Sequence, residues 1–179
     1  MNNKTIRVNE HIIIREATPD DAKRLIEYVK KVSGETDFLT FSPEEFKTTI
    51  EKQKKYLKKY SERDNCLAII AVDDKDRVIG MLDFDGGPKL RTKHSGEFGI
   101  TVLKEYWGMG IGKTMVSYLI TWAKNLGTVR KIDLKVRSDN KRAIDLYKRM
   151  GFEIEGEISR FFCIDGSFYS ILCMGLKID

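Results

Sequence analysis

Cysteine, histidine and proline are scarce in this chain of 179 residues, which has three cysteines, two histidines and three prolines. The cysteines, Cys66, Cys163 and Cys173, are odd in number, scattered and in no CxxC pair. This pattern argues against a disulfide framework and against a structural zinc site. The two histidines, His11 and His94, are too few for a histidine-rich metal site, so the sequence predicts no metal.

Long apolar runs are lacking as well. No segment approaches the roughly 18–20 apolar residues that a membrane span needs, and the apolar stretch near the start is too short for a secretory signal. The few unpaired cysteines fit a reducing compartment, so we expect a cytoplasmic protein without a membrane segment. No linker, repeat or low-complexity segment interrupts the chain, and its length suits one domain over residues 1–179.

The charge balance is weakly basic. Lysine and arginine number 32 against 27 acidic residues, which gives a net charge of +5, and much of the excess lies in residues 54–60. Such a run is typical of a solvated helix face, although it would also attract an acidic partner such as a phosphorylated cofactor or RNA. No RNP-like or zinc-finger pattern is present, so we expect no dedicated nucleic-acid binding.

Apolar periodicity predicts a mixed α/β chain with helices interleaved among about seven strands. Pro19 after Thr18, and the capping-box spacing of Ser42 and Glu45, mark the starts of the first two helices. The expected strands are 11–17, 66–72, 77–87, 96–103, 131–137, 152–158 and 168–178, and the expected helices are about 19–33, 43–60, 110–126 and 140–150.

Residues 107–114 read WGMGIGKT and lie between a predicted strand and a predicted helix. This order is that of a phosphate-binding loop, because amide N–H groups at a helix start lack intrahelical partners and the helix dipole adds positive charge. The spacing matches neither a Walker loop nor the GxGxxG dinucleotide motif. On its own the loop leaves a phosphate site and a plain glycine-rich helix start both open.

A second segment, VRSDNKRAIDLYKRMGF (136–152), changes that balance. It follows the pattern Asn-x-x-Ala-x-x-Leu-Tyr-x-x-x-Gly-Phe from Asn140 to Phe152. With this pattern some thirty residues after the glycine loop, the chain resembles the GNAT superfamily of acetyl-CoA-dependent N-acetyltransferases. The first superfamily motif, (Gln/Arg)-x-x-Gly-x-(Gly/Ala), reads Trp107-x-x-Gly110-x-Gly112 here, so tryptophan replaces the usual Gln or Arg. The resemblance covers about residues 6–178 and implies a mixed, mostly antiparallel seven-stranded sheet flanked by helices and splayed between its fourth and fifth strands.

The resemblance implies acetyl-CoA as the cosubstrate. Its pyrophosphate would lie on the amides of the loop and helix start, and its pantetheine amides would pair with the backbone of the fourth strand. Asn140 would contact the cofactor, and it is also suited to be an ordinary N-cap. Nothing is assigned to the Trp107 side chain, because the amides do the binding. The implied cofactor-binding residues are Ile100, Thr101, Val102, Gly108, Met109, Gly110, Ile111, Gly112, Lys113, Asn140 and Tyr147.

The resemblance also indicates catalytic groups. Tyr147 would protonate the departing thiolate, although its helical spacing is also that of a core tyrosine. Glu97 would act as the base, directly or through water, as a glutamate near this place does in some relatives. The alternative for Glu97 is a solvated or salt-bridged strand residue, and His94 is the second candidate for the base. No Ser/His/Asp or Cys/His set is visible, so direct transfer fits better than a nucleophilic cysteine, and we expect the cysteines in the core.

Three functions stay open at this point. The chain would acetylate a small primary amine, such as a polyamine or an aminoglycoside-like compound, or it would acetylate a protein N-terminus or lysine, ribosomal proteins included. The third function is a non-catalytic acetyl-CoA-binding module. A homodimer through the last strands is compatible with the family analogy. In the superfamily the first two helices and the turn before the last strand line the acceptor site, and there this chain offers Glu35, Asp37, Phe38, Phe41, Arg160, Phe161, Phe162 and Tyr169.

Overall fold

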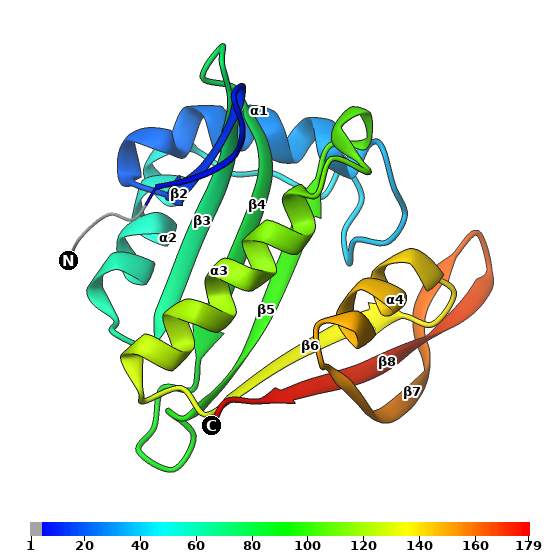
Figure 1. Ribbon diagram of the computed structural model, residues 1–179. Coiled ribbons are helices and arrows are strands. Elements are labelled where there is room, and N and C mark those ends of the chain that lie inside the picture. Colours follow the sequence, from blue (N-terminus) through cyan, green and yellow to red (C-terminus); the bar gives the residue numbers. More distant parts are fainter. Residues whose placement is uncertain (1–4) are drawn as a thin grey trace.

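The computed structural model describes residues 5–179, and residues 1–4 lie outside the described part. Its helices are α1 (Ala22–Ser33), α2 (Ile50–Glu62), α3 (Ile111–Leu126) and α4 (Lys141–Arg149), with short 3-10 turns η1 (Pro19–Asp21) and η2 (Lys104–Tyr106). Its strands are β1 (Ile6–Asn9), β2 (Ile12–Glu16), β3 (Cys66–Asp73), β4 (Val78–Gly86), β5 (Ser95–Val102), β6 (Lys131–Arg137), β7 (Glu153–Ile164) and β8 (Ser167–Lys177) (Figure 1). No helix within residues 5–179 is long and apolar enough to cross a membrane.

The eight strands described in residues 5–179 form one open sheet in the order β1-β2-β3-β4-β5-β6-β8-β7. Neighbouring strands are antiparallel except β5 and β6, which are parallel. The predicted fold class is confirmed, but the sheet has eight strands rather than seven. The additional strand is β1, an edge strand whose four residues are too few to show a period in the sequence. The single domain over residues 1–179 stays a prediction, because residues 1–4 lie outside the described part.

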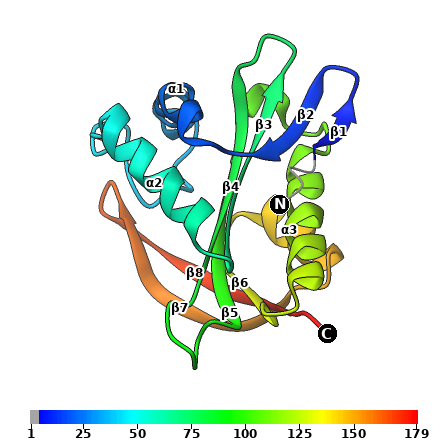
Figure 2. The same ribbon diagram turned by 90° about the vertical axis from the view of Figure 1, so that its left-hand side faces the viewer.

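Helices cover both faces of the sheet (Figure 2). On the face of α1 and α2, the Tyr28 hydroxyl of α1 lies 2.8 Å from the Thr101 hydroxyl of β5. On the face of α3 and α4, Tyr147 of α4 packs edge-on against Phe98 of β5. Because side chains alternate along a strand, the even-numbered residues of β5 face α3 and α4, and the odd-numbered residues face α1 and α2.

A buried ion pair anchors the start of α1 to the sheet. The fully buried Asp21 carboxylate accepts two 2.8 Å hydrogen bonds from Arg15 of β2 and one of 2.8 Å from the Thr18 N–H. Burial acts to raise the pKa of Asp21, but these hydrogen bonds and the charges of Arg15 and Arg24 outweigh it and lower the pKa to about 2. The carboxylate therefore stays ionised and fixes α1 over its face of the sheet.

The predicted start of the second helix is wrong. α2 begins at Ile50 rather than at residue 43. The Ser42 N–H does donate to Glu45 Oε2 at 2.7 Å, as a capping box requires, but the chain makes a single turn there. The N-cap is Thr49, whose Oγ1 accepts from the backbone N–H of Lys52 at 3.2 Å. A capping pattern favours a turn, and whether a helix continues depends on what the following turns pack against.

Candidate active site

The parallel strands β5 and β6 part after only three paired positions. Ser95, Gly96 and Glu97 pair with Lys131, Ile132 and Asp133, and beyond these residues β6 pairs with β8 alone. Figure 1 shows the two strands diverging from this end. The predicted splay between the fourth and fifth expected strands is thereby confirmed. From Phe98 onward, the edge of β5 that faces β6 has no strand partner within residues 5–179.

Backbone alternation decides which peptide groups of β5 face the splay. The N–H of Leu103 donates to the Ile79 carbonyl of β4 at 2.9 Å, and the Ser95 carbonyl accepts from the Gly87 N–H at 2.8 Å. Odd-numbered residues of β5 therefore direct their peptide groups toward β4, and Ile100 and Val102 direct theirs toward β6. The prediction for Thr101 needs correction on this ground, because its backbone faces β4 and its hydroxyl contacts Tyr28.

Trp107 makes a contact that the motif does not reveal. Its indole N–H donates to the Val102 carbonyl at 2.7 Å, and the Arg142 guanidinium of α4 lies 5.0 Å from the ring centroid. The tryptophan thus ties the loop before α3 to the end of β5 and occupies one of the carbonyls that face the splay. Among the residues predicted to pair with the pantetheine, the Ile100 N–H, the Ile100 carbonyl and the Val102 N–H are the groups left for an extended ligand.

In the glycine loop, glycine is favoured by the backbone conformation rather than by a lack of space for a side chain. Gly108 and Gly110 have φ values of 88° and 82°, where residues with a side chain are strained, although a Cβ at either position would meet nothing within 4 Å. α3 begins directly afterwards, and its first N–H groups lack intrahelical partners. A Cβ on Gly112 would lie 3.8 Å from Leu146 of α4 and 3.9 Å from Ile100 of β5. The start of α3, the edge of β5 and α4 therefore converge at the splay.

Lys113 and Met109 of the loop are exposed, and Ile111 is buried beneath it. Asn140 is the N-cap of α4, where its Oδ1 accepts from the Ala143 N–H at 3.2 Å. Asn140 thus has the ordinary N-cap role, and its contact with the cofactor stays a prediction. Amide binding by residues 108–113 likewise stays a prediction, although the arrangement of their N–H groups suits an anion.

Tyr147 lies on α4 within an aromatic cluster. Its ring packs edge-on against Phe98 at 5.9 Å and against Phe152 at 5.8 Å between centroids. The side chain is buried, and its hydroxyl forms no hydrogen bond with another described residue from 5 to 179. Burial raises the pKa of Tyr147, so the hydroxyl keeps its proton near neutral pH. Tyr147 therefore makes the contacts of a core tyrosine, and it also has a hydroxyl that is able to donate a hydrogen bond. Its role as the acid stays a prediction.

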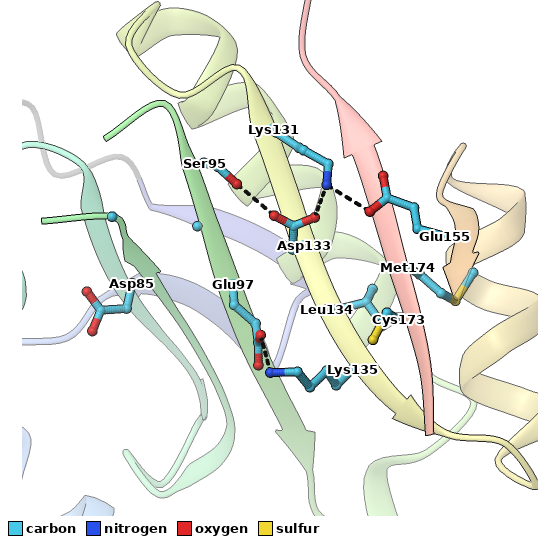
Figure 3. A pocket seen from close by; sticks show the side chains of 12 residues that line it. Asp85, Ser95, Glu97, Lys131, Asp133, Leu134, Lys135, Glu155, Cys173 and Met174 are labelled. Atoms are coloured by element: carbon cyan, nitrogen blue, oxygen red, sulfur yellow. Dashed lines mark hydrogen bonds and ion pairs between the residues drawn. The ribbon is translucent and has the colours of Figure 1, made fainter. Parts of the chain in front are cut away.

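Glu97 lies at the paired end of the splay, on the α1/α2 face. Its Oε2 forms a 2.7 Å ion pair with Lys135 of β6, and both residues line an open cavity of about 360 Å³ (Figure 3). Ser95, Asp133 and Cys173 line the same cavity. The salt-bridged state expected as the alternative is therefore present, and catalysis by Glu97 stays a prediction.

The second candidate base lies before β5. His94 is exposed, and its carbonyl accepts hydrogen bonds from the backbone of Arg130 and Lys131 at 2.7 and 3.0 Å. Its position at the closed end of the β5–β6 pair places it farther along the strand from the splay than Glu97. The expectation that all three cysteines lie in the core holds for Cys66, whereas Cys163 is exposed on β7.

Part of the predicted acceptor region assembles around an arginine that the sequence did not single out. The buried Arg137 guanidinium lies between the rings of Phe38 and Tyr169, at 4.3 and 4.4 Å from their centroids, and donates to the Asp37 carbonyl at 2.9 Å. A 2.7 Å ion pair with Asp139 holds it. Arg137 thus joins the segment between α1 and α2 to β8 at the open end of the splay.

Other predicted acceptor residues have different partners. Phe41 stacks on Phe46, with 5.9 Å between centroids, and Glu35 Oε2 accepts from the Lys104 N–H at 2.7 Å in the turn before the glycine loop. On the β7–β8 hairpin, Phe161 packs against Phe162 with 5.5 Å between centroids, and the Arg160 guanidinium lies over the Phe168 ring at 4.7 Å.

Comparison with known proteins agrees with this geometry. The model of the acetyltransferase (GNAT) family matches residues 33–152. The chain belongs to the acetyltransferase (GNAT) family. A GNAT-family acetyltransferase structure from Streptococcus pneumoniae is 32% identical, with a TM-score of 0.90 over 93% of this chain and 99% of that one. The predicted family is confirmed, and with it the enzyme class, an acetyl-CoA-dependent acyltransferase.

Curated relatives carry different acceptors in their names. L-amino acid N-acetyltransferase AaaT of Escherichia coli (strain K12) is 32% identical over 60% of this chain and 66% of the relative. Spermidine N(1)-acetyltransferase of Vibrio cholerae is 27% identical over 60% of this chain and 62% of the relative. The matches thus span less than two thirds of the length of these relatives. The GNAT fold is also that of yncA from Salmonella typhimurium, solved with its cofactor acetyl-CoA, at 17% identity and a TM-score of 0.80 over 94% of each chain.

Proposed function

We propose that this GNAT protein transfers the acetyl group of acetyl-CoA directly to a primary amine. The observation that carries the proposal is the convergence at one place of an unpaired strand edge, a helix start with free N–H groups and the Tyr147 hydroxyl. The first fits an extended amide-containing chain and the second fits a phosphate group. A pantetheine arm with a pyrophosphate, as in coenzyme A, has both chemistries in that order.

In this proposal the pantetheine amides pair with Ile100 and Val102, and the pyrophosphate lies on the N–H groups at the start of α3. Lys113 adds a positive charge for the phosphates. The amine nitrogen attacks the thioester carbonyl carbon, a C–N bond forms, and the C–S bond breaks. Tyr147 donates its proton to the departing sulfur, and the proton that the nitrogen loses as the amide forms passes to the Tyr147 oxygen and restores the hydroxyl.

The acceptor must lose a proton before it attacks. An alkylamine with a pKa of about 10 is only about one part in a thousand neutral at pH 7, so a nearby base raises the rate. Glu97 remains the base that the family resemblance indicates. Its Oε2 is already engaged by the Lys135 ammonium at 2.7 Å, which an incoming acceptor would have to displace.

Within this reaction we propose a small cationic amine as the acceptor, because the charged lining of the cavity beside the splay has four carboxylates, namely Asp85, Glu97, Asp133 and Glu155, against two lysines, Lys131 and Lys135. A protein N-terminus or lysine is the second candidate. It is favoured by the aromatic side chains exposed around the hairpin and the α1–α2 segment, where Phe38, Phe161 and Phe168 are 37%, 45% and 55% exposed. The homodimer also stays a prediction.

The test is release of free thiol from acetyl-CoA with a panel of acceptors. Spermidine, L-alanine and a peptide with an N-terminal alanine represent the three acceptor chemistries. We expect turnover with spermidine and less with the other two. Turnover with the peptide alone would favour the second candidate. Binding of coenzyme A measured by calorimetry, with no turnover on any acceptor, would instead support a non-catalytic binding module.

A further inference from the structure

The α1/α2 face of the sheet carries a carboxylate without a role so far. Asp83 lies on β4 directly opposite Gly99 of β5. The hydroxyls of Tyr56 and Tyr60, both on α2, donate to Asp83 Oδ2 at 3.0 and 3.1 Å. No side-chain donor within residues 5–179 bonds to Oδ1, so this oxygen has no side-chain partner among the described residues.

Asp83 differs from the carboxylates beside it in having no basic partner. Asp85 on the same strand is paired with Lys59 at 2.6 Å, and Glu97 on β5 is paired with Lys135 at 2.7 Å. No lysine, arginine or histidine in the described part of the chain forms an ion pair with Asp83. Two tyrosine hydroxyls orient this carboxylate without neutralising it, which leaves its charge to be satisfied by a cation from outside.

Gly99 keeps Oδ1 accessible. The glycine is exposed, and a Cβ there would lie 3.6 Å from Asp83 Oδ1 and within 4 Å of nothing else apart from its chain neighbours. Any larger side chain at this position would therefore cover the carboxylate. Its φ angle lies outside the left-handed region, so the backbone does not require glycine.

The position of Gly99 along β5 relates Asp83 to the reaction. β5 pairs with β6 only as far as Glu97, so Gly99 lies where the strands part. The preceding residue, Phe98, faces the other way and contacts the Tyr147 ring. Asp83 and Tyr147 therefore lie at the same level of β5, on opposite faces of the sheet, with the splay beside them.

We propose that Asp83 Oδ1 receives the ammonium group of the acceptor over Gly99 and removes its proton. The inference rests on the proposed function. The N–H bond of the ammonium group breaks, an O–H bond forms on Oδ1, and the electron pair stays on the nitrogen that attacks the thioester. The proton passes to water once the acetylated product leaves. The base then acts from the α1/α2 face, and the acid that serves the leaving sulfur acts from the α3/α4 face.

The surroundings of Asp83 suit a base. Burial raises the pKa of its carboxyl, the hydrogen bonds from Tyr56 and Tyr60 oppose this, and the charge of Asp85 adds to the rise. The net direction is upward, toward the pH at which the enzyme would work, where proton transfer from an amine is more favourable. The titratable and charged groups that face this region are Tyr28, Tyr56, Lys59, Tyr60, Arg63, Asp85, Glu97 and Lys135.

The test compares Asp83→Asn with the wild type across pH. The probes are spermidine, L-alanine and the alanine peptide, and kcat/KM is followed for those that the wild type acetylates. Asparagine keeps an oxygen for the tyrosines but cannot take a proton. We expect a loss of about 100-fold at pH 7 for an alkylamine, which shrinks steadily as the pH approaches the pKa of the acceptor amine, about 10 for an alkylamine and about 8 for the peptide N-terminus, because solution then supplies neutral amine. The affinity for coenzyme A stays unchanged.

Glu62→Gln is the control, since it removes an exposed carboxylate at the end of α2 that is paired with Lys58 and lies outside the cavity. We expect its pH profile to keep the shape of the wild-type profile. A second variant, Gly99→Val, keeps Asp83 and both tyrosines but covers Oδ1, and a branched residue suits a strand. We expect it to raise KM for the acceptor at every pH, and it decides the matter if Asp83→Asn does not fold.

The outcomes separate the two proposals. A wild type that binds coenzyme A but acetylates no probe overturns the proposed function together with this inference. If the wild type is active and Asp83→Asn has the same pH profile, the proposed role of Asp83 is overturned and the proposed function is not. A Gly99→Val variant with wild-type KM does the same, because the ammonium group would then not lie over Gly99.

Discussion

The two faces of β5 differ in chemistry although their residues alternate along one strand. On the α3/α4 face, Phe98 and Ile100 approach Tyr147 and the start of α3 through apolar contacts. On the α1/α2 face, Glu97 forms an ion pair and Thr101 a hydrogen bond between hydroxyls, with the exposed Gly99 between them. In the proposed reaction, one strand thus serves the cofactor with its edge and one face, and the acceptor with the other face.

The difference shows how each site is specified. The cofactor side depends on backbone groups, whose direction follows from strand alternation, from a helix start and from two glycines with positive φ. The acceptor side depends on side chains of α1, α2, β4, β5, β6 and β8 that meet only in the folded protein. We therefore expect substitutions on the two faces to separate cofactor binding, proton transfer and stability.

The largest effect is expected on the α3/α4 face. Tyr147→Phe removes the proton donor but keeps the ring contacts with Phe98 and Phe152, so turnover should fall by about 10²–10⁴-fold. Coenzyme A affinity measured by calorimetry should hardly change. Tyr28→Phe is the control from the opposite face, where a buried hydroxyl is lost without a role in proton transfer. Equal turnover of Tyr147→Phe and the wild type would remove the acid role.

The next effect concerns the anchor of the α1/α2 face. Asp21→Asn leaves the Arg15 charge without its buried partner, and the free energy of unfolding measured with urea should fall by about 3–5 kcal/mol. Turnover per folded molecule should stay within a few fold of the wild type, because Asp21 lies outside both sites. A loss of turnover with unchanged stability would contradict the anchoring role.

The same residue gives a pH dependence with a defined sign. The folded pKa of Asp21 is lowered to about 2, against an ordinary value of about 3.9. Its contribution to stability is therefore complete above about pH 5 and is lost as the pH falls toward 2. The difference in melting temperature between the wild type and Asp21→Asn should be constant from pH 5 to 8 and shrink below about pH 4. A difference that grows in acid would contradict this assignment.

A smaller effect is expected in the glycine loop. Gly110→Ala forces a side chain into a φ of 82°, which costs about 1–2 kcal/mol and misdirects the N–H groups at the start of α3. We expect coenzyme A to bind about tenfold more weakly, measured by calorimetry. Gly112→Ala is the control for stability, since its φ is not positive and its Cβ would make ordinary contacts at 3.8 and 3.9 Å. Equal melting temperatures for the two variants would show that conformation is not what selects glycine at position 110.

The smallest effect is expected at Trp107. Trp107→Phe loses the hydrogen bond to the Val102 carbonyl but keeps an aromatic ring for Arg142, so stability should fall by about 1 kcal/mol. The KM for acetyl-CoA should change by less than about tenfold. Trp107→Gln, which introduces the residue usual in the superfamily, restores a donor and tests whether the indole itself is needed. A change of a hundredfold in either variant would mean that the side chain contacts the cofactor.

Much of the fold follows from local signals. Periodicity and turn residues predicted β6 at its observed bounds and placed α3 and most other strands to within a few residues, but β7 continues to Ile164 where the expected strand ends at residue 158. The errors lie where a local signal was weak or was overruled. β1 is too short to show a period, and the capping spacing at Ser42 forms its turn without continuing as a helix, because α2 is instead capped by Thr49.

The sequence by itself determined the family, the glycine loop and the helix carrying Tyr147, because these features depend on neighbours a few residues away. Only the tertiary structure decided that Trp107 occupies the Val102 carbonyl, that Arg137 lies between Phe38 and Tyr169, and that Asp83 faces Gly99. Apart from the first, these contacts join residues of separate strands and helices. Side chains so far apart in the chain leave no spacing to read, since only the register of β4 with β5, the pairing of β6 with β8 and the packing of the α1–α2 segment bring them together.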